Sequence, residues 1–347
     1  MVAAAAYSWR FLLVVAAVAV LVYGLVKLRL LVFPIIIALM LTTIVAPAAE
    51  WLTKRGVPRG LASLTLILGG LAAIVGLVVL LAPLVAGELG DVGTSLREGT
   101  DRVLRWLAEG PFEVSERDVD RFIDQAGEQI SQSRGQIASG VVAGAIALIE
   151  VIAGILLTIV LLFFFVRDGD RINRWIESQF RDGNQQHARE MGVRAWAVLR
   201  GYVRGIVIIA LFDGAVIGVT VLVIGAPLAA PLALITFFGA FFPIVGAVVA
   251  GVIAALVTLV TSGLSDALIV TAVTVVINQL EGDVLQPLVM GKSLNLHPVA
   301  ILVALTAGGI LAGVPGAFLA VPVAAVAATV GNYLKSVGGT EPVSTTS

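Results

Sequence analysis

The chain has 347 residues, of which 59% are hydrophobic and 13% are charged, and its mean hydropathy is +1.04. A soluble domain is about one quarter charged, so this composition excludes an ordinary soluble protein and predicts an all-α integral membrane protein. The chain has no cysteine and two histidines, which excludes disulfides and thiolate metal sites and argues against a histidine metal centre. We therefore expect no metal and no other cofactor.

Residues 1–86 predict three transmembrane helices. Apolar runs cover Phe11–Val26, Leu30–Ala46 and Leu61–Val85, each close to the length of about 20 residues that a membrane span needs. No convincing cleavage site precedes Lys27, so we interpret the first run as an uncleaved helix rather than as a signal peptide.

Residues 87–140 interrupt this pattern with an acidic segment. It carries eleven acidic residues against six arginines, a net charge of −5. Its second half has an apolar stripe at helical spacing, formed by Val119, Phe122, Ile123, Ala126 and Ile130. The pattern predicts a small helical extracytoplasmic insert, whose apolar face packs on the membrane domain or on a neighbouring subunit.

The second half of the chain returns to apolar runs. Residues 141–166 predict a fourth span, and residues 167–204 form a basic cytoplasmic or interfacial segment with eight arginines against five acids, a net charge of +3. Residues 205–335 predict a C-terminal transmembrane core with broken helices. The residues expected to break them are Pro243, Gly246, Gly313, Pro315 and Gly316. About seven or eight transmembrane helices fit this layout, some of them broken or re-entrant, and residues 336–347 predict a disordered tail.

The arginines predict the orientation of the chain. Short basic loops face the cytoplasm, whereas long acidic segments are translocated regardless of their charge. The basic loop Lys54–Arg59 and residues 167–204 are then cytoplasmic, and the insert lies outside. Three spans separate the N-terminus from the insert, and Lys335 follows the last apolar run, so we expect both termini in the cytoplasm.

Cysteine labelling tests this orientation, because the chain contains no cysteine of its own. A single cysteine at Ser115, in the insert, is expected to react with a membrane-impermeant reagent in intact cells. A single cysteine at Gln185, in the basic segment, is expected to react only after lysis. Equal labelling of both positions before lysis would contradict the predicted orientation.

A polar cluster directly follows the apolar run Asp266–Ile277. Its five side chains are Asn278, Gln279, Glu281, Asp283 and Gln286. A carboxylate at membrane depth costs about 3 kcal/mol or more unless it is paired or hydrated. The cluster therefore predicts a polar cavity on the pathway of a substrate or ion, with helix breaks at Gly282 and Pro287. The alternative interpretation is the interfacial end of a span.

Two further acids, Glu150 and Asp213, stand alone within apolar spans. Each fits either an ion or proton site on the transport pathway or a structural partner of an arginine or a backbone donor. Arg200 and Arg204 precede the fifth span one turn apart, where they would anchor it at the inner headgroups or gate an anionic substrate. His297 fits an interfacial residue or the start of a helix better than a proton relay.

Several segments of the C-terminal half carry specific motifs. They are FFPIVGAVVAG (Phe241–Gly251), the acid-to-proline spacing Glu281–Pro287, PLVMGKSLNLHP (Pro287–Pro298) and GVPGAFLAVPVAA (Gly313–Ala325). These motifs resemble the autoinducer-2 exporter (AI-2E) family of bacterial multi-pass membrane transporters. The resemblance implies an inner-membrane protein that exports a small polar signalling molecule, with some relatives assigned cation/proton exchange. It also implies a ring of identical subunits, for which a pentamer is one option.

The chain departs from the family pattern at three positions. Ile244 stands where an aromatic residue is usual, and Gly282 and Asp283 replace what is more typically an asparagine and a larger residue. The extra acid favours a cation or proton over a neutral substrate.

No motif of an enzyme or of an ATP-driven pump is present: the sequence lacks GxxxxGK[ST], HExxH and GxSxG. We therefore interpret the protein as a secondary transporter or exporter of a small polar molecule, and not as an enzyme. The alternatives are a cation/proton antiporter, an exporter or flippase of an amphiphile, and a non-transporting scaffold that acts through the insert. The expected partners are the lipid bilayer, the substrate, a proton or cation and further copies of the chain, but no nucleic acid.

Overall fold

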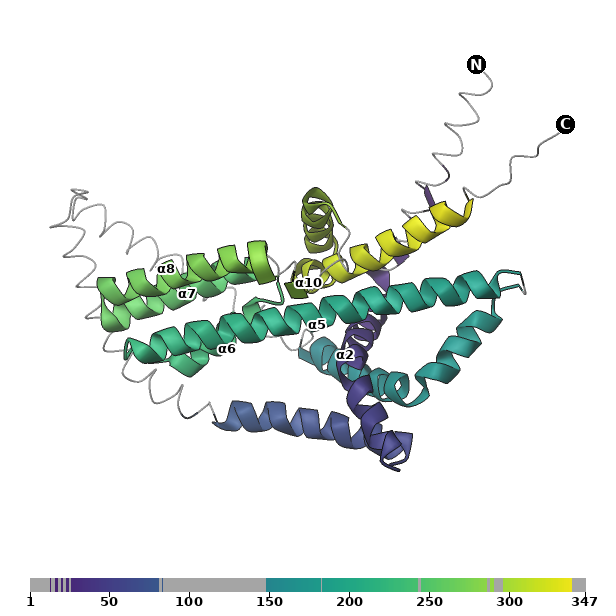
Figure 1. Ribbon diagram of the computed structural model, residues 1–347, viewed down its shortest axis with the longest axis horizontal. Helices are drawn as coiled ribbons and strands as arrows, with labels where there is room; N and C mark the ends of the chain where they lie inside the picture. Colours follow the sequence, from purple (N-terminus) through teal and green to yellow (C-terminus); the bar gives the residue numbers. More distant parts are fainter. Residues whose placement is uncertain are drawn as a thin grey trace, which may run out of the picture. The chain divides into compact units, whose positions relative to one another are not determined.

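The computed structural model (Figure 1) describes residues 26–80, 148–181, 183–242, 245–285, 288–289 and 296–338, together with single positions before residue 26 and residue 83. The predicted insert 87–140 lies outside the described residues, as do Pro243, Gln286, Pro287 and residues 339–347. Every regular element in the described part is a helix.

Six helices of the described part are long and apolar enough to cross a membrane. They are α2 (Arg29–Lys54), the Arg59–Leu80 helix, the Leu148–Ser178 helix, α5 (Gln185–Val223), α8 (Leu264–Leu280) extended by the π-helical turn η1 (Glu281–Leu285), and α10 (Pro298–Gly338). Two shorter apolar helices are α6 (Ala229–Gly239) and α7 (Val245–Ser262). The prediction of an all-α, multi-pass membrane protein is confirmed.

The chain divides into two compact units. The first contains Met1–Ile67, Glu150–Val203 and Ser293–Ser347, and the second contains Leu68–Ile149 and Arg204–Lys292. The α5 helix contributes its first half to one unit and its second half to the other.

In the first unit, α2 packs against the Leu148–Ser178 helix. Ala38 and Leu162 form a buried apolar cluster with Ile67 from the following helix. Polar side chains within α2 bond to its own backbone: the Thr42 hydroxyl donates to the Ala38 carbonyl oxygen at 2.6 Å. The helix ends at Lys54, and Gly56 then turns the chain with a φ of +93°, a conformation that glycine adopts without steric cost.

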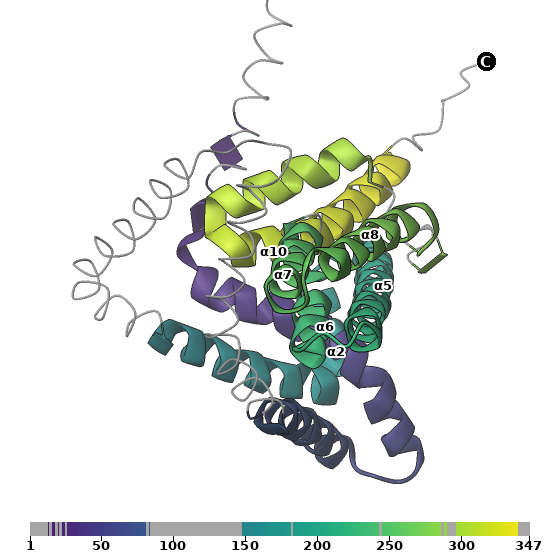
Figure 2. The ribbon, with the colours of Figure 1, turned by 90° about the vertical axis from the view of Figure 1, so that its left-hand side faces the viewer.

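The α10 helix of the first unit is two helical arms joined at a sharp bend. Ala312 (φ −147°, ψ 19°) and Gly313 (φ 64°, ψ −147°) leave the helical conformation, which divides residues 298–311 from residues 314–338. The arms fold back on each other in Figure 2, and their backbones meet at Gly308 and Gly316. The bend lies within the Gly313–Gly316 segment where the sequence predicted a break.

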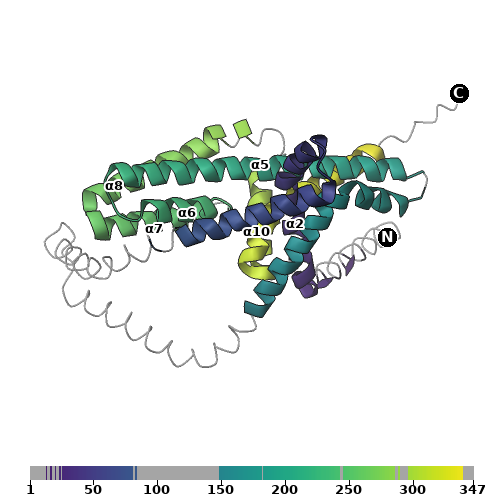
Figure 3. The ribbon, with the colours of Figure 1, turned by 90° about the horizontal axis from the view of Figure 1, so that it is seen from below.

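In the second unit, α6 and α7 form a second helical hairpin, beside the second half of α5 (Figure 3). Their backbones cross at Gly239 and Gly246, where a side-chain carbon on either residue would collide with the opposite chain. The α6 helix ends at Gly239 and α7 begins at Val245. Gly246, one of the two residues predicted to break the helix, lies in the first turn of α7, and Pro243, the other, lies outside the described residues.

Glycines also bring α5 close to this hairpin. A Cβ atom at Gly214 would lie 2.8 Å from the Ala233 carbonyl oxygen, and one at Gly218 would lie 2.8 Å from the Ala233 Cβ. Small residues one turn apart permit such close approach of apolar helices. The core beneath this contact is apolar and draws on four helices: its members include Ile217, Leu232, Ala254 and Val270.

Candidate functional site

Asp213 is the most deeply buried carboxylate of the described second unit, with 4% of its surface exposed. It lies on α5 next to Phe212, which packs against the apolar core. Its Oδ1 atom is fully buried and has no hydrogen-bond partner among the described residues. A buried polar oxygen without a partner costs about 1–3 kcal/mol, and more when it is charged, so this atom is a candidate ligand for something small.

A cavity of about 20 Å³ adjoins Asp213. Its lining comes from α5, α6, α7 and α8: Asp213, Ile217, Thr236, Ala240, Ala247, Gly251, Thr274, Ile277 and Asn278. A cavity needs about 10–15 Å³ of this kind of volume to hold one water molecule. The space therefore fits one water molecule or one small cation.

The polar groups around this cavity are mostly oxygen acceptors. The Thr236 hydroxyl donates its hydrogen to Leu232 O, and the Thr274 hydroxyl donates to Val270 O, both at 2.8 Å. Their oxygen lone pairs remain available to a ligand, as do the Asp213 carboxylate and the Asn278 amide oxygen. Oxygen ligands of this kind suit a proton-carrying water or a hard monovalent or divalent cation.

Small residues make this arrangement possible. Gly251 of α7 faces Thr274 of α8, where a Cβ atom would lie 2.7 Å from the Thr274 Cγ2. Together with the close approach of α6 to α5, this contact draws the hydroxyls and the carboxylate into one small space.

The predicted polar cluster is only partly brought together with Asp213. Asn278 lines the cavity, and Glu281, half-buried, is the charged neighbour that acts electrostatically on Asp213. Gln279 and Asp283 are exposed on the surface of the unit. Acidic residues at membrane depth commonly mark ion or proton pathways.

The local winding of the helix differs from what the sequence predicted. Gly282 does not end the helix: Glu281–Leu285 continue α8 as a π-helical turn. A π turn changes the angular step between residues, so Gln279 and Asp283 no longer share the face that regular α-helical spacing would give them. Such turns are frequent at functional sites.

The remaining predicted residues have other surroundings. Glu150 belongs to the first unit and pairs with Arg29 at 3.8 Å, which favours the structural role weighed for it. His297 accepts a hydrogen bond on its Nδ1 atom from the Val299 amide at 3.3 Å, at the start of α10. Arg204 is exposed, and Arg200 lines a second, larger cavity in the first unit.

The sequence did not indicate Thr236 or Thr274. Threonine in an apolar helix commonly satisfies its hydroxyl on its own backbone, so it gives no signal of a site. The larger cavity was also missed, because its charged residues are distributed over four helices between residues 29 and 223.

Comparisons with known proteins agree on a transport family. A family model described as AI-2E family transporter matches residues 11–335. The chain is 37% identical over 321 residues to a protein of Mycobacterium tuberculosis (strain CDC 1551 / Oshkosh) named "Putative transport protein MT0215", covering 92% of this chain and 88% of that protein. It is 27% identical over 307 residues to YrrI of Bacillus subtilis (strain 168), which carries the same description, covering 84% and 83%. These names describe transport rather than catalysis.

Proposed function

Since the chain belongs to the AI-2E transporter family, we propose that it is a secondary transporter of a small polar molecule and takes up a coupling proton or cation at Asp213. The observation that carries the second half of the proposal is the buried Oδ1 atom of Asp213, which lacks a partner in the described residues and adjoins a small cavity that Thr236, Thr274 and Asn278 also line. Ionisable residues inside membrane helices commonly mark ion pathways.

Export of an autoinducer-2-like molecule is the form of transport that the motif resemblance favours. The closest alternative is a cation/proton antiporter, and the acceptor-rich surroundings of Asp213 support it equally well. In both cases the Asp213 carboxylate would bind and release a proton or cation during each transport cycle. Glu281, which acts electrostatically on Asp213, would be the second acid on the same pathway.

Flux measurements in proteoliposomes test this proposal. Purified protein would be reconstituted, and release of autoinducer-2 and movement of protons would be followed with and without an imposed pH gradient. We expect flux above that of protein-free vesicles and a dependence on the gradient. Proton movement without movement of autoinducer-2 would select the antiporter. No flux of either kind would favour the scaffold alternative and contradict the proposal.

Glu281 provides a separate prediction. Glu281→Gln keeps the volume and most of the hydrogen bonding of the side chain but removes its titration. If Glu281 relays protons, this variant should assemble normally but lose most of the pH dependence of flux. If Glu281 only binds a polar substrate, the Gln variant should retain much of the activity and Glu281→Ala should lose it. Wild-type flux and pH profile in both variants would remove Glu281 from the mechanism.

The proposal also covers the location, orientation and assembly of the protein. We place the protein in the bacterial inner membrane with both termini in the cytoplasm and residues 87–140 outside, as the distribution of arginines favours. The functional core would lie within residues 205–335, and the assembly would be a ring of identical subunits.

A further inference from the structure

A larger cavity lies in the first unit and plays no part in the function proposed above. Its volume is about 380 Å³, within the range of about 300–1,000 Å³ that small-molecule sites occupy. It is formed by α2, the first turns of the Arg59–Leu80 helix, the Leu148–Ser178 helix and the first half of α5. All of these helices are long and apolar enough to cross a membrane.

Most of the cavity wall is apolar. Side chains such as Ile35, Leu39, Phe165 and Ile176 line it. Pro47 also lines it and has no amide hydrogen, so it cannot donate to the Thr43 carbonyl oxygen one turn earlier. The wall therefore suits a hydrocarbon chain.

Side chains of both positive and negative charge line the same cavity. Arg59 and Asp170 already form an ion pair, with 2.6 Å between the Arg59 Nη1 and the Asp170 Oδ2. Glu50 and Arg200 also line the cavity, are exposed, and make no ion pair within the described part of the chain. Glu50 acts electrostatically on Arg59 without a direct ion pair, so its carboxylate and the Arg200 guanidinium can both contact a ligand directly.

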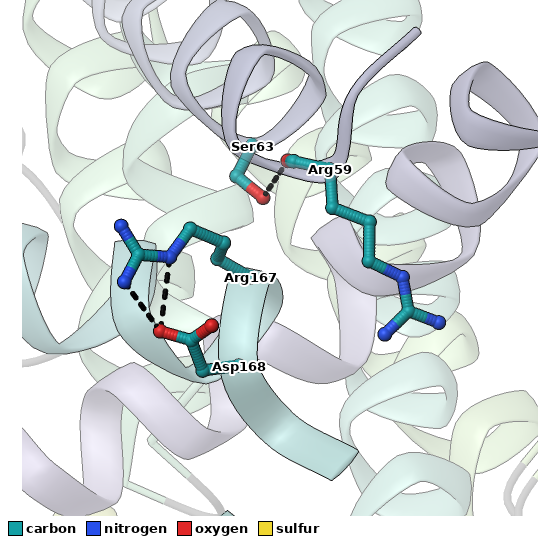
Figure 4. Close-up of polar contacts among 4 residues, drawn as sticks. All are labelled: Arg59, Ser63, Arg167 and Asp168. Carbon is teal, nitrogen blue, oxygen red and sulfur yellow. Dashed lines mark hydrogen bonds and ion pairs between the residues drawn. The ribbon is translucent and has the colours of Figure 1, made fainter. Parts of the chain in front are cut away.

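Arg167, a further arginine of the Leu148–Ser178 helix, is not available to bind an anionic group of a ligand. Arg167 binds Asp168 through two hydrogen bonds of 2.9 and 2.6 Å, and its guanidinium lies 5.0 Å from the ring centroids of Phe163 and Phe164. Figure 4 shows the Arg59 guanidinium directed away from this pair, while the Arg59 carbonyl oxygen accepts the Ser63 hydroxyl at 2.8 Å. The Arg167 charge is therefore compensated locally.

We propose that this cavity binds a zwitterionic phospholipid, of the phosphatidylethanolamine type. Its ammonium group would donate to Glu50, its phosphate would accept from Arg200, and an acyl chain would lie along the apolar wall. Trp196, another lining residue, supplies an indole of the kind that favours the membrane–water interface. The compensated charge set favours a zwitterion over an anionic lipid, because a net negative headgroup would meet Glu50 and Asp170 as like charges.

Native mass spectrometry of the purified full chain, with defined phospholipids added, tests the proposal. We expect phosphatidylethanolamine to be retained about tenfold better than phosphatidylglycerol, because a hydrogen bond to a charged group has about that effect on affinity. Phosphatidylcholine, which lacks ammonium hydrogens, should behave like phosphatidylglycerol. Glu50→Gln should remove the preference, and Arg200→Gln should weaken the retention of all three lipids.

The matched controls are Glu177→Gln for Glu50→Gln and Arg189→Gln for Arg200→Gln. Each control removes a charge of the same sign from a residue that does not line the cavity. Both should keep the wild-type preference. Ala46→Trp, which fills the apolar part of the cavity, should lower the retention of every phospholipid. Equal retention of the three lipids by the wild type, or an unchanged preference in Glu50→Gln, would overturn the proposal. Competition by soluble phosphoethanolamine as strong as that by the whole lipid would overturn the lipid assignment.

Discussion

Asp213→Asn is expected to uncouple transport from an imposed pH or cation gradient while leaving the fold intact. The asparagine side chain keeps the volume of the carboxylate but neither titrates nor carries the charge that holds a cation. Coupling between two ligands is typically worth about 5- to 150-fold in affinity, so gradient-driven flux should fall by about tenfold or more. The measurement is flux in proteoliposomes with and without the gradient.

Thermal stability separates this effect from damage to the fold. The Asp213 Oδ1 atom is buried without a described partner, so its replacement by a neutral amide should leave the melting temperature unchanged or higher. Thr236→Val, which removes one oxygen from the same cavity and keeps its shape, should give a smaller loss of coupling. An Asp213→Asn variant with the wild-type gradient dependence would exclude Asp213 from ion coupling.

Gly246→Val and Gly316→Val are expected to lower the free energy of unfolding by about 3 kcal/mol or more each, at the upper end of what overpacking costs. At Gly246 the new Cβ would meet the Gly239 backbone, whose Cα atom would lie 3.0 Å away. At Gly316 it would meet the Gly308 backbone and the Ala312 Cβ, the latter at 2.8 Å. Backbone cannot rotate aside as a side chain can, so the arms of each hairpin must separate.

Gly331→Ala is the matched control in the second arm of α10, because nothing lies within 4 Å of a Cβ atom there. It should leave stability unchanged or raise it by up to about 1 kcal/mol, the difference in helix propensity between the two residues. Folded yield and thermal unfolding in detergent are the readouts. Equal stability of the two valine variants and the wild type would show that the hairpin arms are not packed at these glycines.

The sequence predicted the helices well because the length of an apolar run reports directly on a membrane span. The breaks in α10 and between α6 and α7 were also predictable, since glycine and proline act on the backbone locally. The tight crossings at Gly239 and Gly308 were not, because they depend on which residue lies opposite across a hairpin.

The candidate sites were harder to predict from the sequence than the helices. Asp213 and Asn278 were each singled out, but their meeting at one cavity depends on how α5 packs against α8. The π-helical turn at Glu281 leaves no pattern in a sequence that was interpreted with regular α-helical spacing. Glu50 and Arg200 likewise line one cavity only because four helices come together around it.

The short arms of the two hairpins constrain how this protein is made. The α6 helix has 11 residues, about 16 Å of helix, and the first arm of α10 covers residues 298–311, about 21 Å. Neither reaches across a hydrocarbon core of about 30 Å. The insertion machinery therefore cannot release either arm into the lipid as an independent span, and each must wait until the ribosome has delivered its partner. Each hairpin is therefore expected to enter the membrane as one unit, α6 together with α7 and the first arm of α10 together with the second.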